Sequence, residues 1–119
     1  MEQLNQARCV PCEGGVPTAT DSEIAGYLVQ LPGWVITEVD HVKRLSKSFA
    51  FDNFVHALAF TNRVGELAEQ EGHHPAILTE WGKVTVTWWT HAIGGLHKND
   101  FVMAAKTEEA FQSAAGAKR

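Results

Sequence analysis

The sequence joins a predicted long helix to a predicted β-hairpin through the stretch Glu69-Gln70-Glu71-Gly72-His73-His74-Pro75. Gly72 is suited to the positive φ at which helices commonly end, and Pro75 biases His74 toward an extended backbone. His73 and His74 are adjacent, and an imidazole is a polar group that costs free energy if it is buried without partners. The stretch therefore predicts two histidines just past a helix end, placed for proton transfer or metal ligation.

The residues after this junction predict a hairpin with strands at 77–80 and 83–90 and a tight turn at Trp81-Gly82. Counting outward from the turn pairs Glu80 with Lys83, Thr79 with Val84, Ile77 with Val86 and Pro75 with Trp88. The same register places His91 beside the histidine pair and puts Val84, Val86 and Trp88 on the face toward the helices. Turn length thus predicts that a third imidazole meets the first two.

The remaining segments predict helices at about 20–31, 53–71 and 98–115 and another hairpin at 34–51. In that hairpin, a turn at Asp40-His41 pairs Val39 with Val42, Glu38 with Lys43 and Ile36 with Leu45, so that opposite charges and apolar side chains match. The order α-β-β-α-β-β-α predicts an α+β fold, with one four-stranded antiparallel sheet and three helices on one face.

The starts and buried faces of these helices can also be predicted. Thr20 and Glu23 fit a capping box, and Asp52 is a good N-cap for the second helix. Asp100 lies in the first turn of the last helix, where the helix dipole favours a carboxylate; alternatively, it orients an imidazole or a substrate. For the second helix we expect a buried stripe of Phe54, Ala57, Leu58, Thr61, Gly65 and Ala68, widened by Phe60, Val64 and Leu67.

Composition bounds the class of protein. The chain has 119 residues, 45% of them hydrophobic and 20% charged, which is typical of one globular domain. The net charge of −4, with no basic cluster before Lys118-Arg119, argues against nucleic-acid binding. Neither a signal peptide nor an apolar run long enough for a membrane span is found, so we expect a cytoplasmic protein. We divide it into a loosely ordered arm at 1–19 and a folded domain at 20–119.

The arm contains one Cys-x-x-Cys pair, Cys9 and Cys12. A structural zinc site usually needs a second pair, and a redox motif needs a strand-to-helix context that this Pro- and Gly-rich segment lacks. We therefore interpret the pair as reduced thiols in a flexible arm, and metal binding together with a distant histidine stays open as the lesser alternative.

Three converging histidines and nearby carboxylates allow two kinds of chemistry. One is a His₃ zinc site with an open position, and the other is general acid–base catalysis on a polar ring. Adjacent metal-binding histidines are less common than pairs two or four residues apart, so the spacing slightly favours acid–base catalysis. Any single histidine could also be a polar residue at a helix end, but three that converge argue against that interpretation.

Several spaced motifs together resemble the pterin-4a-carbinolamine dehydratase family. They are Glu69-x-x-x-His73-His74-Pro75, Trp81-Gly82-Lys83-Val84, Thr90-His91, Gly95-Leu96, Asp100-Phe101 and, earlier, Ala57-Leu58-Ala59-Phe60. The resemblance covers roughly residues 31–105. The chain departs from the family pattern at His97, where Ser or Thr often caps the last helix.

The resemblance implies dehydration of 4a-hydroxytetrahydropterin to quinonoid dihydropterin, without a metal or other cofactor. It implies that His73 and His91 form the acid–base pair, that His74 mainly binds substrate, and that Glu69 and Asp100 support them. It further implies a homodimer or homotetramer and a role in recycling the pterin used by phenylalanine hydroxylase. Two alternatives stay open: a non-enzymatic dimerisation or regulatory cofactor of a hydroxylase or transcription system, and a metal-dependent hydrolase.

Overall fold

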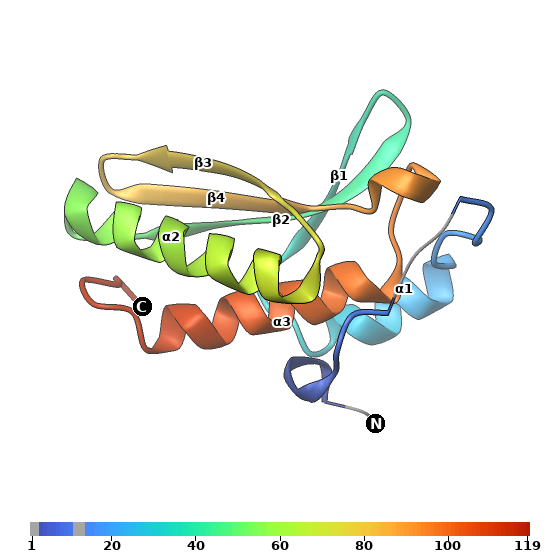
Figure 1. The fold of residues 1–119 in the computed structure, drawn as a ribbon, viewed down its shortest axis with the longest axis horizontal. Coiled ribbons are helices and arrows are strands. Elements are labelled where there is room, and N and C mark those ends of the chain that lie inside the picture. The colour runs from blue at the N-terminus through green and yellow to red at the C-terminus, as the bar shows by residue number, and fades with distance from the viewer. Residues whose placement is uncertain (1–2, 11–13) are drawn as a thin grey trace.

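A computed structural model describes residues 3–10 and 14–119 of the chain (Figure 1). Its elements are η1 (Leu4–Gln6), α1 (Asp21–Leu28), β1 (Val35–Val39), β2 (Val42–Ala50), α2 (Phe54–Glu71), β3 (Ala76–Glu80), β4 (Lys83–Trp88), η2 (His91–Ile93) and α3 (Lys98–Gln112). The strands form one antiparallel sheet in the order β1-β2-β4-β3. The helices lie on one face of this sheet, which confirms the predicted α+β fold.

Both predicted hairpin registers are confirmed. In the first hairpin Val39 pairs with Val42, Glu38 with Lys43 and Ile36 with Leu45. In the second, Glu80 pairs with Lys83, Thr79 with Val84 and Ile77 with Val86. Asp40 and His41 both have positive φ, 52° and 64°, as a two-residue turn of the hairpin type requires.

The core lies between the sheet and the helices. Val84, Val86 and Trp88 are fully buried on the helix side of β4, as predicted. On the other side of the sheet, hydroxyl pairs link β2 to β4, with Oγ atoms 3.0 Å apart in Ser46 and Thr87. Alternation along β4 thus separates an apolar inner face from a hydroxyl-rich outer face.

Two predictions for α2 were wrong, one for its N-cap and one for its buried face. Asn53 is the N-cap and accepts a hydrogen bond from the backbone of His56, whereas Asp52 contacts the His56 ring with an Oδ1–Nδ1 distance of 2.6 Å. The buried stripe consists of Ala57, Phe60, Val64 and Ala68. The side chains at Phe54 and Leu58, which we expected inside, are 44% and 43% exposed. The two apolar faces of this helix are adjacent, and the sheet and α3 together cover the one centred on Phe60.

Three elements end earlier than predicted. Helix α1 ends at Leu28 and not at residue 31. Strand β4 stops at Trp88, because the chain folds back and Thr90 forms an isolated bridge with Gly95. His91 therefore lies in the short helix η2 and not on the strand. Helix α3 ends at Gln112, three residues before the predicted Ala115.

His97 caps α3, although it differs from the Ser or Thr that we expected from the family pattern. Its Nδ1 accepts a hydrogen bond of 3.0 Å from the backbone N–H of Asn99, and the Asp100 carboxylate accepts one from the backbone N–H of His97. An imidazole nitrogen thus takes the place of the hydroxyl oxygen in a capping box. The predicted box of Thr20 and Glu23 at α1 is also present.

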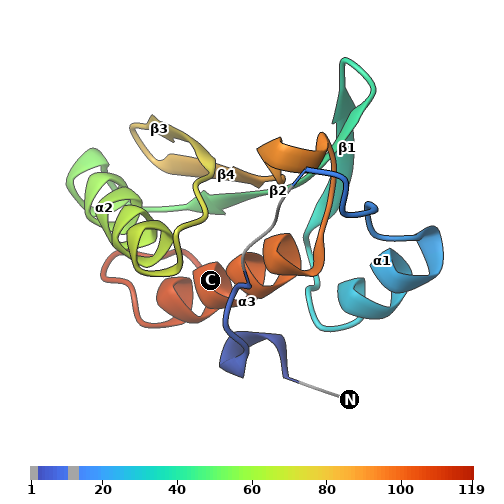
Figure 2. The same ribbon diagram turned by 45° about the vertical axis from the view of Figure 1, so that its right-hand side comes forward.

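Part of the N-terminal arm packs against the domain. Leu4 is only 2% exposed, and Figures 1 and 2 show η1 against α3 on the side away from the sheet. The mobility of this arm in solution stays a prediction, and Cys12 lies outside the described residues. Within the part of the chain that the structure describes, no helix is both long and apolar enough to span a bilayer.

The cap at His97 yields a test of stability. Replacing His97 with Ala removes the acceptor for the Asn99 N–H and is expected to lower the free energy of unfolding by about 0.5–2 kcal/mol. His97→Ser supplies a hydroxyl oxygen instead and should stay close to the wild type. Urea denaturation of the three proteins measures both values. Equal stability of His97→Ala and the wild type would contradict a capping role.

Candidate active site

A cavity of about 430 Å³ lies where the end of α2, η2 and the start of α3 come together. His73, His74 and His91 all line it, so the structure brings the three predicted imidazoles to one place. The route differs from the prediction for His91, because η2 and not a strand pair delivers that residue.

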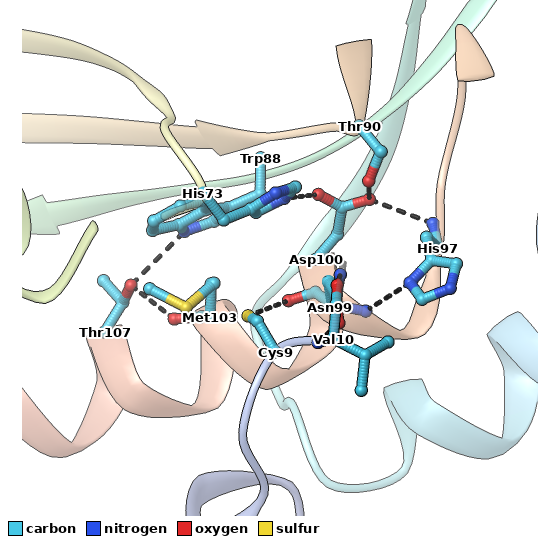
Figure 3. Close-up of polar contacts among 10 residues, drawn as sticks. All are labelled: Cys9, Val10, His73, Trp88, Thr90, His97, Asn99, Asp100, Met103 and Thr107. Atoms are coloured by element: carbon cyan, nitrogen blue, oxygen red, sulfur yellow. Dashed lines mark hydrogen bonds and ion pairs between the residues drawn. The ribbon is translucent and has the colours of Figure 1, made fainter. Parts of the chain in front are cut away.

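The His73 ring is held on two sides. Its Nε2 lies 2.6 Å from Oδ1 of Asp100, and its plane stacks on Trp88 at 7° with ring centroids 5.8 Å apart (Figure 3). The side chain of His73 is 11% exposed and that of Asp100 is 0% exposed. A carboxylate only accepts hydrogen bonds, so it selects the ring tautomer with hydrogen on Nε2 and leaves the lone pair on Nδ1.

Asp100 is satisfied by two further donors. Its Oδ2 accepts the Thr90 hydroxyl at 2.8 Å and the backbone N–H of His97 at 3.0 Å. Asp100 lies in the first turn of α3, as predicted, and its carboxylate also contacts an imidazole. That it orients this imidazole for function stays a prediction. Thr90 belongs to one of the motifs found in the sequence, but its bond to Asp100 was not predicted, since nothing in its local pattern indicates a buried partner.

His74 and Glu69 form a second, exposed pair. The distance from His74 Nε2 to Glu69 Oε1 is 2.5 Å, and the side chains are 60% and 79% exposed. His74 lines the cavity, whereas the carboxylate that lines it is Glu71 and not Glu69. Glu69 therefore contacts a residue that lines the cavity, His74, without lining the cavity itself.

His91 rests on an aromatic neighbour. Its ring centroid lies 4.6 Å from that of Trp89, and the guanidinium carbon of Arg44 lies 4.0 Å from the Trp89 ring centroid. His91 belongs to η2, Trp89 directly follows β4, and Arg44 lies on β2. The tilted Trp89 ring supports the His91 ring from the outer face of the sheet. The sequence did not reveal the contact of Trp89 with Arg44, because Arg44 is far away along the chain.

Glu71 connects the cavity to the N-terminal arm. Its carboxylate accepts hydrogen bonds from the backbone N–H of Cys9 at 2.9 Å and from Nε of Arg8. Burial raises the pKa of the Glu71 carboxyl, but these two hydrogen bonds and the charges of Arg8 and Lys106 outweigh it. The pKa therefore lies below its ordinary value, and the group is ionised at neutral pH.

Cys9 also lines the cavity, but as a protonated thiol. Burial, followed by the negative charges of Glu71 and Asp100, raises its pKa to about 11. A thiol of that pKa is a weak nucleophile near neutral pH. The redox state of the Cys9 and Cys12 pair stays a prediction.

The described residues contain no group of three or more His, Cys, Asp or Glu side chains arranged to hold a metal ion. The carboxylate partners of His73 and His74 each occupy one ring nitrogen. Hydrogen-bonded imidazoles in a polar cavity are suited to proton transfer.

The fold and cavity define a small α+β protein with a histidine-lined pocket, and comparison with known proteins places it in a family. A sequence model described as Pterin 4 alpha carbinolamine dehydratase matches residues 17–110. A protein of Syntrophotalea carbinolica, provisionally named a pterin-4-alpha-carbinolamine dehydratase, is 59% identical over 108 residues, covering 91% of this chain and 96% of the relative. The crystal structure of a transcriptional coactivator/pterin dehydratase from Brucella melitensis aligns with a TM-score of 0.70 and 32% identity, covering 79% of this chain and 98% of that one.

The chain belongs to the pterin-4a-carbinolamine dehydratase family. This confirms the resemblance drawn from the spaced motifs, and with it the enzyme class, a hydro-lyase. The family match begins at residue 17, so the arm residues that reach the cavity lie outside it.

The raised pKa of Cys9 predicts slow alkylation. At about pH 8, iodoacetamide should modify Cys9 in the native protein at least about tenfold more slowly than it modifies free cysteine, because so little thiolate is present. Mass spectrometry of the peptide that contains Cys9 measures the rate, with urea-unfolded protein as the control. A native rate equal to that of free cysteine would show that the thiol is activated.

The lowered pKa of Glu71 predicts a pH-dependent contribution to stability. A pKa that is lower in the folded state means that the ionised carboxylate stabilises the fold at neutral pH. This contribution is lost as the pH falls below the ordinary value of 4.5 and through the folded pKa. Glu71→Gln should be less stable than the wild type near neutral pH, and the difference should shrink on acidification. Denaturation curves across this pH range measure it, with the exposed Glu66→Gln as the control. A difference that does not change with pH would contradict this prediction.

Proposed function

We propose that this chain removes water from a pterin-4a-carbinolamine, a 4a-hydroxytetrahydropterin, to give the quinonoid dihydropterin, with His73 and His91 as the general acid–base pair. The observation that supports the proposal most is that His73, His74 and His91 line one cavity. Family membership supplies the substrate class.

The reaction needs two proton transfers and no change of oxidation state. The substrate carries a hydroxyl on a carbon next to a ring nitrogen. The nitrogen lone pair forms a C=N bond as the C–O bond breaks, and an acid protonates the departing oxygen to give water. A base takes one proton from the ring, so the sum of the two steps is loss of H₂O. Imidazoles with pKa values near 6.5 can serve in both roles at neutral pH.

The contacts of His73 suit one of these roles. Asp100 fixes the Nε2–H tautomer, so Nδ1 has the lone pair with which a base can take a proton or, once protonated, an acid can return it. Stacking on Trp88 limits rotation of the ring. Because the ring is already oriented, little reorganisation is required when the proton moves.

His74 and Glu69 are assigned to binding and support. The His74 ring is 60% exposed at the cavity, where it can donate to or accept from the polar edge of a pterin. Its contact with Glu69 orients it from outside. Asp100 supports His73 in the same way from inside the protein.

The wider role belongs to the same proposal. We infer that the enzyme is cytoplasmic, acts without a metal or other cofactor, and recycles the pterin used by phenylalanine hydroxylase. We also infer a homodimer or homotetramer. Exposed apolar side chains on the edge strands β1 and β3, Val35 at 54% and Leu78 at 59%, are consistent with contacts between copies.

Turnover by histidine variants tests the catalytic assignment. We expect His73→Ala and His91→Ala each to lower the enzyme-catalysed rate of carbinolamine dehydration by about 10²-fold or more, the usual contribution of one general acid or base. His56→Ala is the matched control, because His56 lies on α2 beside Asp52 and does not line this cavity. Stopped-flow absorbance of the substrate measures the rates. Wild-type rates in both His73→Ala and His91→Ala would refute the assignment while leaving the fold intact.

A second candidate is a non-enzymatic role, favoured by the structural relative from Brucella melitensis, which is described as a transcriptional coactivator as well as a pterin dehydratase. The same variants separate the two roles. A His73→Ala, His91→Ala double variant that lacks turnover but still sustains normal phenylalanine hydroxylase levels in cells would support a role independent of catalysis.

A further inference from the structure

The N-terminal arm reaches the cavity at residues 9 and 10, although the family match begins only at residue 17. Cys9 and Val10 are among the residues that line the cavity. This segment lies outside the residues that the family model matches, yet it reaches the place where the substrate is proposed to bind.

The arm is anchored before it reaches the cavity. Leu4 is buried in the hydrophobic core at 2% exposure, and its backbone N–H donates to Oε1 of Gln30 at 3.1 Å. Asn5 Nδ2 lies 2.6 Å from Glu109 Oε2, and Lys106 Nζ donates to the Asn5 carbonyl. These contacts hold the arm along α3, so that it runs toward the N-terminal end of that helix.

Asn99 holds Val10 by two reciprocal hydrogen bonds. Its Oδ1 accepts from the Val10 backbone N–H at 3.0 Å, and its Nδ2 donates to the Val10 carbonyl at 2.7 Å. Asn99 is 3% exposed and precedes Asp100, the carboxylate that contacts His73 (Figure 3). One side-chain amide thus fixes the backbone of Val10 beside the catalytic histidines.

Glu71 provides the second attachment, from the other side of the cavity. It binds Arg8 and the Cys9 backbone and is followed directly by Gly72 and His73. The segment between Arg8 and Val10 is therefore fastened at both ends to residues next to the catalytic groups. Yet the Val10 side chain itself is 56% exposed.

We propose that residues 8–10 form one wall of the substrate site, that Val10 makes an apolar contact with the bound pterin, and that Asn99 and Glu71 are positioning residues for this wall. The inference rests on the proposed function and names a further part of the same site. A reduced pterin is a bicyclic ring with a polar edge and apolar faces. Imidazoles can bind its edge, and an apolar wall against a face raises affinity by removing that face from water.

Four variants test the wall: Val10→Ala, Asn99→Ala, the double variant of both, and Asn5→Ala as the control. Val10→Ala removes the apolar contact, and Asn99→Ala releases the backbone that presents it. Asn5→Ala removes one exposed side-chain contact of the arm, while the burial of Leu4 and the bond from Lys106 to the carbonyl of residue 5 remain, and residue 5 does not line the cavity. The readouts are kcat and KM for the carbinolamine, and Kd for the non-reacting probe 7,8-dihydrobiopterin by calorimetry.

We expect Val10→Ala and Asn99→Ala each to raise KM and Kd about three- to tenfold with kcat within about twofold of the wild type. Val10 can contact the ligand only while Asn99 holds its backbone in place. The double variant should therefore have the same KM and Kd as Asn99→Ala alone. Asn5→Ala should leave KM, Kd and kcat unchanged. A loss of kcat in Asn99→Ala without a change in Kd would instead mean damage to the neighbouring Asp100 and would overturn the proposed wall.

The outcomes separate this inference from the proposed function. Wild-type turnover with unchanged KM and Kd in Val10→Ala and Asn99→Ala would overturn the wall and leave the dehydratase activity standing. If the wild-type protein binds dihydrobiopterin, Val10→Ala and Asn99→Ala raise its Kd, and no protein shows turnover, the wall would be supported and the proposed reaction overturned. Wild-type protein that neither binds nor turns over would overturn both.

Discussion

The buried carboxylate of Asp100 is the constraint on which the rest of the site depends. It is 0% exposed and accepts hydrogen bonds from the His73 ring, the Thr90 hydroxyl and the His97 backbone. A carboxylate removed from water costs several kcal/mol unless its oxygens find donors. Those donors come from the end of α2, the end of β4 and the start of α3. The free-energy cost of burying Asp100 is therefore offset only when the chain has brought these three segments together.

The same contacts that stabilise the fold also orient the site. Asp100 caps α3, so its position is set by a helix of fifteen residues, Lys98–Gln112, packed in the core. The His73 ring takes its orientation from that carboxylate and from Trp88, which is fully buried on β4. A proton-transferring group held by rigid elements keeps its geometry more closely than one on a free loop. The arm adds to this arrangement at Asn99, the residue next to Asp100.

Local rules were sufficient for much of the fold. The turns at Asp40-His41 and Trp81-Gly82 set both hairpin registers, because each pair of strands is fixed by the residues that join it. Gly72 ended α2 with a φ of 63°, as predicted. Local rules could not choose between Asp52 and Asn53, since either side chain can cap a helix. They could not choose between the two adjacent apolar faces of α2 either, because that depends on where the sheet lies.

Long-range contacts account for what the sequence could not reveal about the site. Glu69 and Glu71 lie two positions apart on a helix, about 200° around its axis, so only one can face a given cavity, and the pattern does not say which. Val10 and Asn99 are separated by 89 positions. Asn99 and Glu71 hold the arm through the backbone atoms of Val10 and Cys9, which every residue except proline offers. A backbone attachment leaves no signature in the side chains it holds. It therefore allows residues 9 and 10 to vary in size and polarity while the arm stays fastened beside the histidines.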